Sequence, residues 1–127
     1  MSSRLVAAVL DCSDIERMTE FWRSVFDSAA VRRWRDARGK QYVEFGLGTE
    51  SGDLVLLLQP VDDPKRSKNR MHLDLAPRDG AQAAEVARLV RLGATVIVDS
   101  VDSADDPWVV LADPEGNEFC VLPPREA

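Results

Sequence analysis

Apolar residues recur along this chain with two different periods, and each period predicts one kind of element. Spacings of three and four residues predict two amphipathic helices, one over residues 15–26 and one within residues 79–93. We expect the first helix to begin in a capping box formed by Ser13 and Glu16. We expect the second to open at Asp79 and to stop at Gly93, because glycine readily ends a helix.

The remaining apolar stretches are short, lie between turn residues and predict strands. Two of them precede the helices, at residues 5–10 and 70–75. Three follow each helix: 31–35, 41–47 and 54–59 after the first, then 95–98, 108–112 and 118–122 after the second. Turn chemistry separates neighbours, as in the segments 36–39, 50–53 and 113–116.

The two halves of the chain repeat the same order of elements. Each half reads strand, helix, strand, strand, strand, so the predicted fold is α+β with two βαβββ modules. The modules cover residues 4–61 and 69–122, within one domain of residues 1–127. The polar, proline-bearing segment 62–68 is the expected linker. In this alignment Ala7 corresponds to His72.

The last turn and strand, residues 113–122, resemble the C-terminal signature of the glyoxalase/bleomycin-resistance (vicinal oxygen chelate) superfamily. The segment 71–75 and the helix that carries Phe21 and Trp22 are similar to that superfamily as well. The resemblance covers essentially the whole chain. It implies a cupped mixed sheet with the helices on its outer face, and a pocket for a small molecule. It does not specify a reaction, because one fold hosts many chemistries.

The resemblance also implies four positions for the ligands of a divalent metal. In this sequence they fall on Ala7 and His72, and on the residues four places after two turn glycines, Leu56 and Cys120. Only two of these residues offer a donor atom, whereas a bound zinc ion usually has three or four protein ligands. We therefore expect no metal cofactor, and we expect EDTA to leave the melting temperature unchanged.

Net charge and hydropathy narrow the classes of partner. A net charge of −6 and a pI near 4.7 argue against nucleic acid, whose phosphates need a basic face. No apolar run is long enough to cross a bilayer and no signal sequence is evident, so we expect a cytoplasmic protein without a membrane anchor. The cysteines, Cys12 and Cys120, are expected to be free thiols.

His72, Asp74 and Glu118 are the candidate catalytic residues. His72 is the only histidine of the chain and the obvious proton carrier near neutral pH. Strand alternation places Asp74 on the same face as His72, and Glu118 on the same face as Cys120. Each candidate also has a structural alternative: His72 could be a packed polar remnant, and Glu118 could point to solvent beside its turn.

Four further residues are candidates for contacting a substrate: Trp108, Cys120, Trp34 and Tyr42. The aromatic ones lie on predicted strands, where they could stack on a ligand or simply fill the core. Trp108 is the strongest of them, because the polar loop 100–107 precedes it and could form a rim. Cys120 is expected to pack against the ligand rather than to act as a nucleophile.

Three functions fit these residues. The first is a metal-independent lyase or isomerase that acts on a small oxygenated metabolite. The second is a non-catalytic protein that sequesters a small molecule, as bleomycin-resistance members do. The third is a catalytically silent domain kept for association. We favour binding of a small molecule, with catalysis as a further hypothesis.

A homodimer is the expected assembly. The resemblance implies it, because proteins with two modules in each chain are commonly two-fold dimers. The strands also carry more large apolar residues than one core of this size needs, namely Trp34, Phe45, Leu54 through Leu58 and Trp108. The alternative is that the strand 54–59 is buried on both faces of a monomer.

Overall fold

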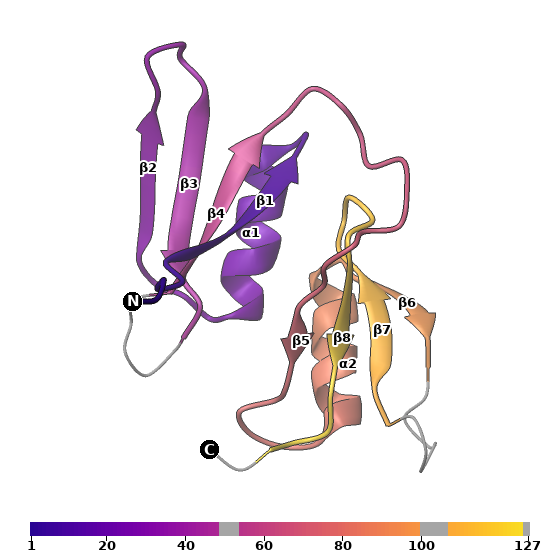
Figure 1. Cartoon of the computed structure of the whole chain (residues 1–127). Helices are drawn as coiled ribbons and strands as arrows, with labels where there is room; N and C mark the ends of the chain where they lie inside the picture. The colour runs from indigo at the N-terminus through magenta and orange to yellow at the C-terminus, as the bar shows by residue number, and fades with distance from the viewer. Residues whose placement is uncertain (49–53, 100–106, 126–127) are drawn as a thin grey trace. The chain divides into compact units, whose positions relative to one another are not determined.

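The computed structural model describes residues 1–48, 54–99 and 107–125, and it divides into two compact units, Met1–Pro64 and Lys65–Ala127. Among the described residues, each unit has one helix and four strands in the order βαβββ, and Figure 1 labels them along the chain. The predicted α+β class with two such modules is therefore confirmed. The elements are β1 (Ala7–Cys12), α1 (Ile15–Val25), β2 (Val31–Arg35), β3 (Gln41–Gly46), β4 (Val55–Pro60), β5 (Asp74–Leu75), α2 (Gln82–Leu92), β6 (Thr95–Val98), β7 (Val109–Ala112) and β8 (Glu118–Val121).

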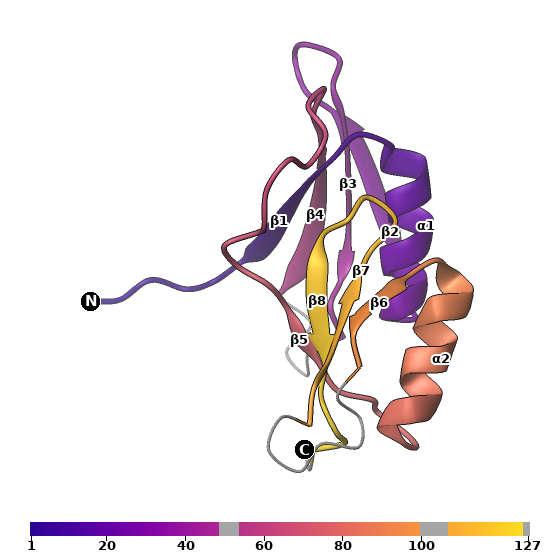
Figure 2. The same ribbon diagram turned by 90° about the vertical axis from the view of Figure 1, so that its right-hand side faces the viewer.

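The first unit is a mixed sheet with α1 along one face, as Figure 2 shows. The strand order is β1-β4-β3-β2, with β1 parallel to β4 and the other pairs antiparallel. Residues on the helix side of the sheet are buried, and they alternate with half-buried residues on the other face. The core combines Met18, Phe21, Trp22 and Val25 of α1 with Val43, Phe45, Leu56 and Leu58 of the sheet.

This burial corrects one part of the argument for a dimer. Phe45, Leu56 and Leu58 are each at most 2% exposed. They were counted among the surplus apolar residues, but they fill the core of their own unit and are not available to an interface. Trp34 remains half-buried, and Trp108 is 40% exposed. Any interface must therefore use apolar side chains other than Phe45, Leu56 and Leu58.

The N-cap of α1 and the first residue of α2 differ from those predicted, whereas α1 begins at Ile15 as expected. Asp14, rather than Ser13, is the N-cap of α1, and its Oδ1 accepts a hydrogen bond from the backbone N–H of Arg17 at 3.1 Å. The second helix begins at Gln82, three residues after Asp79. Gly80 lies between them with a φ of +82°, a left-handed conformation that interrupts helical geometry.

The second unit repeats the arrangement of the first. Its strand order is β5-β8-β7-β6, with β5 parallel to β8, and α2 lies along one face of the sheet (Figure 2). Leu89 of α2 and the sheet residues Val109, Leu111, Phe119 and Val121 are at most 1% exposed and form the core. By alternation, Val110 and its register partner Cys120 lie on the opposite, open face.

β5 is much shorter than predicted, and His72 precedes it rather than lying within it. The side chain of Asn69 explains the difference. Its Oδ1 accepts from the backbone N–H of Glu118 at 3.0 Å, and its Nδ2 donates to the carbonyl oxygen of Glu118 at 3.3 Å. Since these are the backbone groups of β8 that a longer β5 would pair with, the ladder begins only where Leu73 accepts from Cys120.

β1 begins and ends two residues later than predicted, whereas the strands that follow the helices agree closely with the sequence pattern. β2 and β6 have the predicted bounds, and the other strands that follow the helices differ by one residue at one or both ends. The predicted turn at 113–116 is held by Asp113, whose Oδ1 accepts from the backbone N–H groups of Glu115 and Asn117 at 2.9 Å. The predicted turn at 50–53 lies outside the described residues.

Two further expectations concern the cysteines and membrane spans. Cys12 and Cys120 are both buried and free, as predicted. Within the described parts of the chain, neither helix has the length and apolar character needed to span a bilayer.

Candidate functional site

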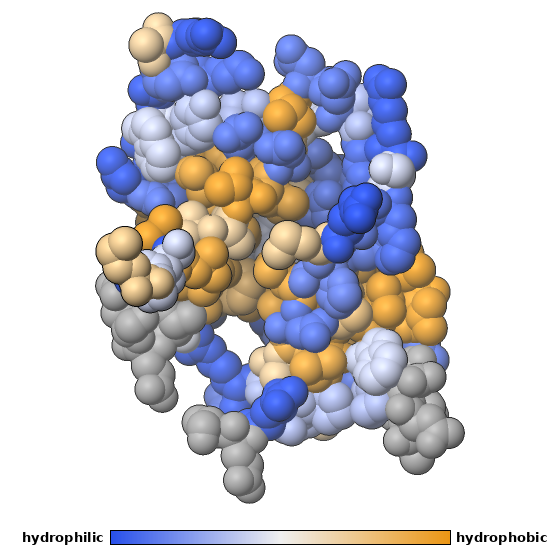
Figure 3. All heavy atoms as spheres, in the orientation of Figure 1, coloured by the Kyte–Doolittle hydropathy of each residue, from blue (hydrophilic) through white to orange (hydrophobic). Residues whose placement is uncertain are grey.

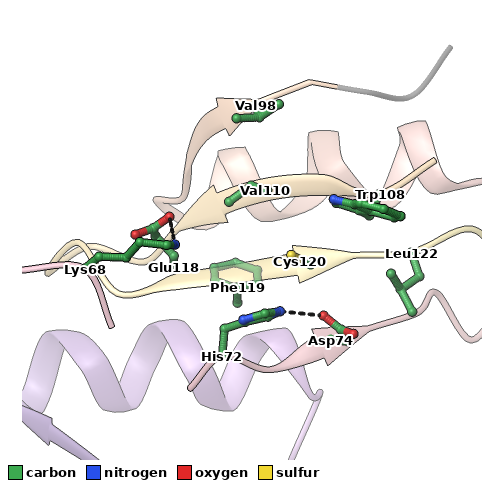
Figure 4. A pocket seen from close by; sticks show the side chains of 10 residues that line it. All are labelled: Lys68, His72, Asp74, Val98, Trp108, Val110, Glu118, Phe119, Cys120 and Leu122. Carbon is green, nitrogen blue, oxygen red and sulfur yellow. Dashed lines mark hydrogen bonds and ion pairs between the residues drawn. The ribbon is translucent and has the colours of Figure 1, made fainter. Parts of the chain in front are cut away.

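The open face of the second sheet, opposite α2, holds a cavity of about 490 Å³. A cavity of this size suits a small organic ligand. Figure 4 shows Lys68 and Glu118 at one end, Trp108 and Leu122 at the other, and His72 and Asp74 along one side. The residues that line it are Lys68, His72, Asp74, Val98, Trp108, Val110, Glu118, Phe119, Cys120 and Leu122.

His72 and Asp74 face each other at the side of the cavity. The Nε2 atom of His72 lies 3.2 Å from Oδ1 of Asp74, and the two side chains are 49% and 52% exposed. A carboxylate in this place can orient an imidazole. Because both side chains remain half open to solvent, a ligand in the cavity can reach them. The predicted juxtaposition of these two residues is therefore present.

Glu118 points into the cavity rather than away from it. Its Oε2 accepts a hydrogen bond from Nζ of Lys68 at 3.1 Å, and its side chain is only 21% exposed. The alternative in which Glu118 simply faces solvent does not describe this structure. Since Lys68 is paired with Glu118, Asp74 is left as the unbalanced negative charge among the lining residues.

Cys120 lies between these two pairs and is 8% exposed. Burial raises the pKa of its thiol, and the negative charge of Asp74 together with a hydrogen bond to that carboxylate raises the pKa further. A thiol with a raised pKa stays protonated and is a poor nucleophile. The raised pKa disfavours a nucleophilic role for Cys120, and its predicted contact with a ligand stays a prediction.

Trp108 is positioned by a hydrogen-bonded amide from α2. The Nε2 atom of Gln82 donates to the carbonyl oxygen of Pro107 at 2.5 Å and to that of Val121 at 2.9 Å. Gln82 thus ties the residue before Trp108 to the end of β8, and the indole is 40% exposed. Most of the predicted rim, residues 100–106, lies outside the described residues.

Trp34 and Tyr42 belong to the first unit and are not among the residues that line this cavity. Their rings stack at 5.6 Å with 15° between planes, as cross-strand partners on β2 and β3. The guanidinium of Arg32 lies 4.6 Å from the centre of the Trp34 ring. These contacts account for the two aromatic residues within their own sheet. Their predicted role in substrate binding stays a prediction.

Sequence reasoning did not include several residues that line the cavity. Val110 and Leu122 could have been predicted from strand alternation, because they lie two residues after Trp108 and Cys120 and so share their face. Lys68 was assigned to the polar linker 62–68. No local signal marks it, since its partner Glu118 is 50 residues away in the sequence.

The sheet register corrects one of the four family positions for metal ligands. Val9 pairs with Leu57 in the first unit and Asp74 pairs with Cys120 in the second, so Leu57 is the counterpart of Cys120. Leu56 instead faces the buried side and is 2% exposed. The count from Gly52 was therefore one residue out. Its consequence is unchanged, because leucine offers no donor atom at either position.

The residues present do not fit a hard divalent ion. Manganese and magnesium favour oxygen donors. Ala7 and Leu57 have no donor side chains, and the second unit offers one imidazole, one carboxylate and one thiol. Asp74, which is not one of the four family positions, supplies the only oxygen of that group.

Comparison with known proteins agrees with the fold. The family model described as "Glyoxalase-like domain" matches residues 7–122. The fosfomycin resistance protein FosX from Listeria monocytogenes, solved with Mn(II) and 1S,2S-dihydroxypropylphosphonic acid, is similar with a TM-score of 0.74 and 14% identity, covering 99% of this chain and 95% of that one. No curated protein matches this chain significantly.

Two other solved structures are similar in the same way. FosX from Mesorhizobium loti gives a TM-score of 0.69 at 16% identity, over 96% of this chain and 92% of that one. The trypanothione-dependent glyoxalase I of Leishmania major gives a TM-score of 0.67 at 16% identity, over 95% of this chain and 86% of that one. At these identities the likeness concerns the fold alone.

Proposed function

This chain belongs to the family of glyoxalase-like domain proteins, and on that premise we propose that it binds a small organic molecule in the cavity of its second unit. One observation carries the proposal. Three separate stretches of the sequence line the same cavity of about 490 Å³ with His72 and Asp74, with Trp108, and with Glu118 and Cys120. An apolar cavity with a few convergent polar groups is the usual form of a ligand site.

The charges of the lining indicate which molecules suit the site. Asp74 and Glu118 are negative and Lys68 is the one positive side chain among the lining residues, apart from any protonation of His72. A neutral or cationic oxygenated molecule therefore fits better than a strongly anionic one. A phosphonate such as the one bound by the Listeria FosX is expected to bind poorly here.

We further propose that the bound molecule undergoes acid–base catalysis in the cavity. The 3.2 Å contact between His72 and Asp74 favours acid–base chemistry, in which His72 moves a proton and Asp74 orients the imidazole. Glu118 is the second carboxylate that such a lyase or isomerase would use, and manganese or magnesium is not required. The alternative function is sequestering without turnover, which the apolar side chains of Val98, Val110 and Leu122 favour.

Binding is tested with a panel of small diols, hydroxy ketones, amino alcohols and hydroxy acids, including 1S,2S-dihydroxypropylphosphonic acid. Since His72 is the only histidine, its imidazole NMR signals report on the cavity without ambiguity. We expect a neutral or cationic member to shift these signals and to saturate. Trp108→Ala should weaken that binding about fivefold, because the loss of one aromatic contact is worth roughly 1 kcal/mol.

Phe26→Ala is the control, since Phe26 is also an aromatic residue that is not fully buried, but it lies in the first unit and does not line the cavity. It should leave the affinity unchanged. Two results would contradict the proposal: binding that survives Trp108→Ala and leaves the His72 signals in place, or a panel without any saturable ligand. Turnover of the bound molecule, lost in His72→Gln, would separate the enzyme from the sequestering protein.

We also propose that the protein is a cytoplasmic homodimer. Two buried free cysteines agree with a reducing compartment. The edge strand β6 carries three exposed apolar side chains, with Val96 37%, Ile97 51% and Val98 49% exposed. Figure 3 shows apolar atoms gathered over this strand. A patch of this kind on an edge strand is typical of an interaction surface.

A further inference from the structure

Asp74 and Trp108 flank one end of the cavity from different strands. Asp74 lies on β5 and pairs with Cys120 of β8, and Trp108 directly precedes β7, where Val110 pairs with the same Cys120. β8 therefore lies between them, and since neighbouring strands are about 4.8 Å apart, about 10 Å separates β5 from β7. Figure 4 shows the Asp74 carboxylate toward the end of the cavity that holds Trp108 and Leu122.

The space between these two side chains suits a single positive charge. A cation binds over the face of a tryptophan ring within about 6 Å of the ring centre, and it pairs with a carboxylate within about 4 Å. A cation between Asp74 and Trp108 can meet both distances at once, because their sum is close to the separation of the two strands. The Asp74 side chain is 52% exposed and Trp108 is 40% exposed, so a ligand can reach both.

The negative charge of Asp74 is not cancelled by the positive residue of the lining. Lys68 pairs with Glu118 at 3.1 Å, and Figure 4 shows both at the opposite end of the cavity. A carboxylate has about four acceptor sites. The contacts of Asp74 with His72 and with the thiol of Cys120 therefore leave room for a further partner.

The lining at this end favours a methylated ammonium over one that carries several N–H groups. A primary ammonium has three donors, and a buried donor without an acceptor costs free energy. Of the lining side chains at this end, only the Asp74 carboxylate offers an oxygen, since the others are an indole, a thiol and a leucine side chain. Methyl groups need no acceptor and gain from contact with these apolar surfaces.

We propose that the ligand of this cavity carries a methylated ammonium group, which lies over the end of β8 between the carboxylate of Asp74 and the indole of Trp108. This inference rests on the proposed binding function and names the class of ligand. Asp74 supplies the charge and Trp108 the aromatic face. Asp74 then contacts the ligand directly, in addition to orienting His72.

Choline and 3,3-dimethyl-1-butanol are the matched probes, because they share one shape and differ by a positive nitrogen or a neutral carbon at a single atom. Titrations of the full chain, followed by NMR, measure the affinity of each. We expect choline to bind at least about tenfold more tightly than the alcohol. Equal affinities, or no saturable binding of choline, would overturn the proposal. Ethanolamine should bind more weakly than choline, and an equal affinity would refute the preference for methyl groups.

Variants assign the two contacts. Asp74→Asn should bring the ratio of the two affinities to about one, because it removes the charge and keeps the shape. Trp108→Leu should weaken choline more than the alcohol, because it keeps an apolar side chain but removes the ring. The ratio is an internal control, since general damage to the cavity weakens both probes alike. An unchanged ratio in Asp74→Asn refutes the contact.

Glu85→Gln is the matched control for the loss of one negative charge. Glu85 lies on α2, on the other face of the same sheet, and is not among the lining residues. This variant should leave the ratio unchanged within about twofold. An equal fall of the ratio in Glu85→Gln and Asp74→Asn would show that net charge, and not the Asp74 contact, attracts the cation.

The binding function and the ammonium subsite fail in different ways. If a neutral member of the small-molecule panel saturates the cavity and choline does not, the binding function stands and the subsite is refuted. If no molecule saturates the cavity, both are refuted.

Discussion

Tyr42 is the only tyrosine of the chain, and its hydroxyl donates a hydrogen bond to Oδ2 of Asp36 at 3.0 Å. This hydrogen bond is the largest cause of the raised pKa of Tyr42. Desolvation and the negative charge of Asp36 raise that pKa further. Desolvation acts to raise the pKa of Asp36, but hydrogen bonds from the backbone of Lys40, from Tyr42 and from the backbone of Arg38 outweigh it and lower that pKa. The contact thus joins a neutral phenol to a carboxylate.

Asp36→Asn should lower the pH at which Tyr42 ionises. The introduced amide can still accept from the turn N–H groups of Arg38 and Lys40 through its oxygen, but it presents an NH₂ group where Tyr42 needs an acceptor. In the native chain the folded state holds Tyr42 neutral. The stabilisation of the folded state by the hydrogen bond from Tyr42 to Asp36 is therefore present at neutral pH. It is lost as the pH rises through the raised pKa of Tyr42.

The measurement is the near-ultraviolet absorbance of tyrosinate, which reports Tyr42 alone. Glu44→Gln, on the same strand but paired with Arg32, should leave the midpoint in place. An unchanged midpoint in Asp36→Asn would show that the hydrogen bond does not govern this ionisation.

Gln82 connects three elements of the second unit and is the first residue of α2. It is 8% exposed, and its amide donates to Pro107 ahead of β7 and to Val121 in β8. α2 has no side-chain N-cap, since Ala81 occupies that position. The amide of Gln82 therefore anchors the beginning of the helix to the sheet by tertiary hydrogen bonds instead of a local cap.

Gln82→Ala should lower the free energy of unfolding by about 1–3 kcal/mol, because it leaves buried carbonyl oxygens without their donor. Urea denaturation followed by circular dichroism measures the change. Arg91→Gln, at an exposed position of the same helix, should change it by less than about 0.5 kcal/mol. If both variants lose the same stability, the amide is not the anchor. The Trp108 environment, followed by fluorescence, should change in Gln82→Ala only.

At the scale of the molecule, the edge strand β6 determines how two copies of the chain can associate. Ile97 lies where the register of β6 and β7 shifts between Val96 and Val98, so it is a bulge residue on an edge strand. A bulge disfavours pairing of the edge with another strand. We therefore expect the proposed dimer to form by contact between the apolar side chains of β6.

Light scattering coupled to size-exclusion chromatography at micromolar concentration should give twice the 14.1 kDa of one chain. Ile97→Lys should shift the mass to that of one chain, because a charge buried in an apolar contact is costly. Val90→Lys, at an exposed apolar position of α2, is the control and should leave the dimer intact. A native mass near 14.1 kDa would rule the dimer out.

The sequence by itself determined the order of elements, the repeat and one face of the candidate site. Apolar periods of 3.6 and 2 are local, so the helices, the strands after them and the shared face of Glu118 and Cys120 could be predicted from neighbouring residues alone. The pairing of His72 with Asp74 on one face followed from the same rule. The glycine stop of the second helix at Gly93 was also a local signal.

Only the tertiary structure decided how far β5 extends, which residues complete the cavity and how close the side chains of His72 and Asp74 lie to each other. Asn69 shortens β5 by occupying backbone groups of Glu118, and Lys68 pairs with the Glu118 side chain, both across about 50 residues of chain. Leu57 rather than Leu56 is the counterpart of Cys120 because strand register, not distance from a turn, decides the face. Such contacts depend on how distant strands align, and short sequence patterns do not encode that alignment.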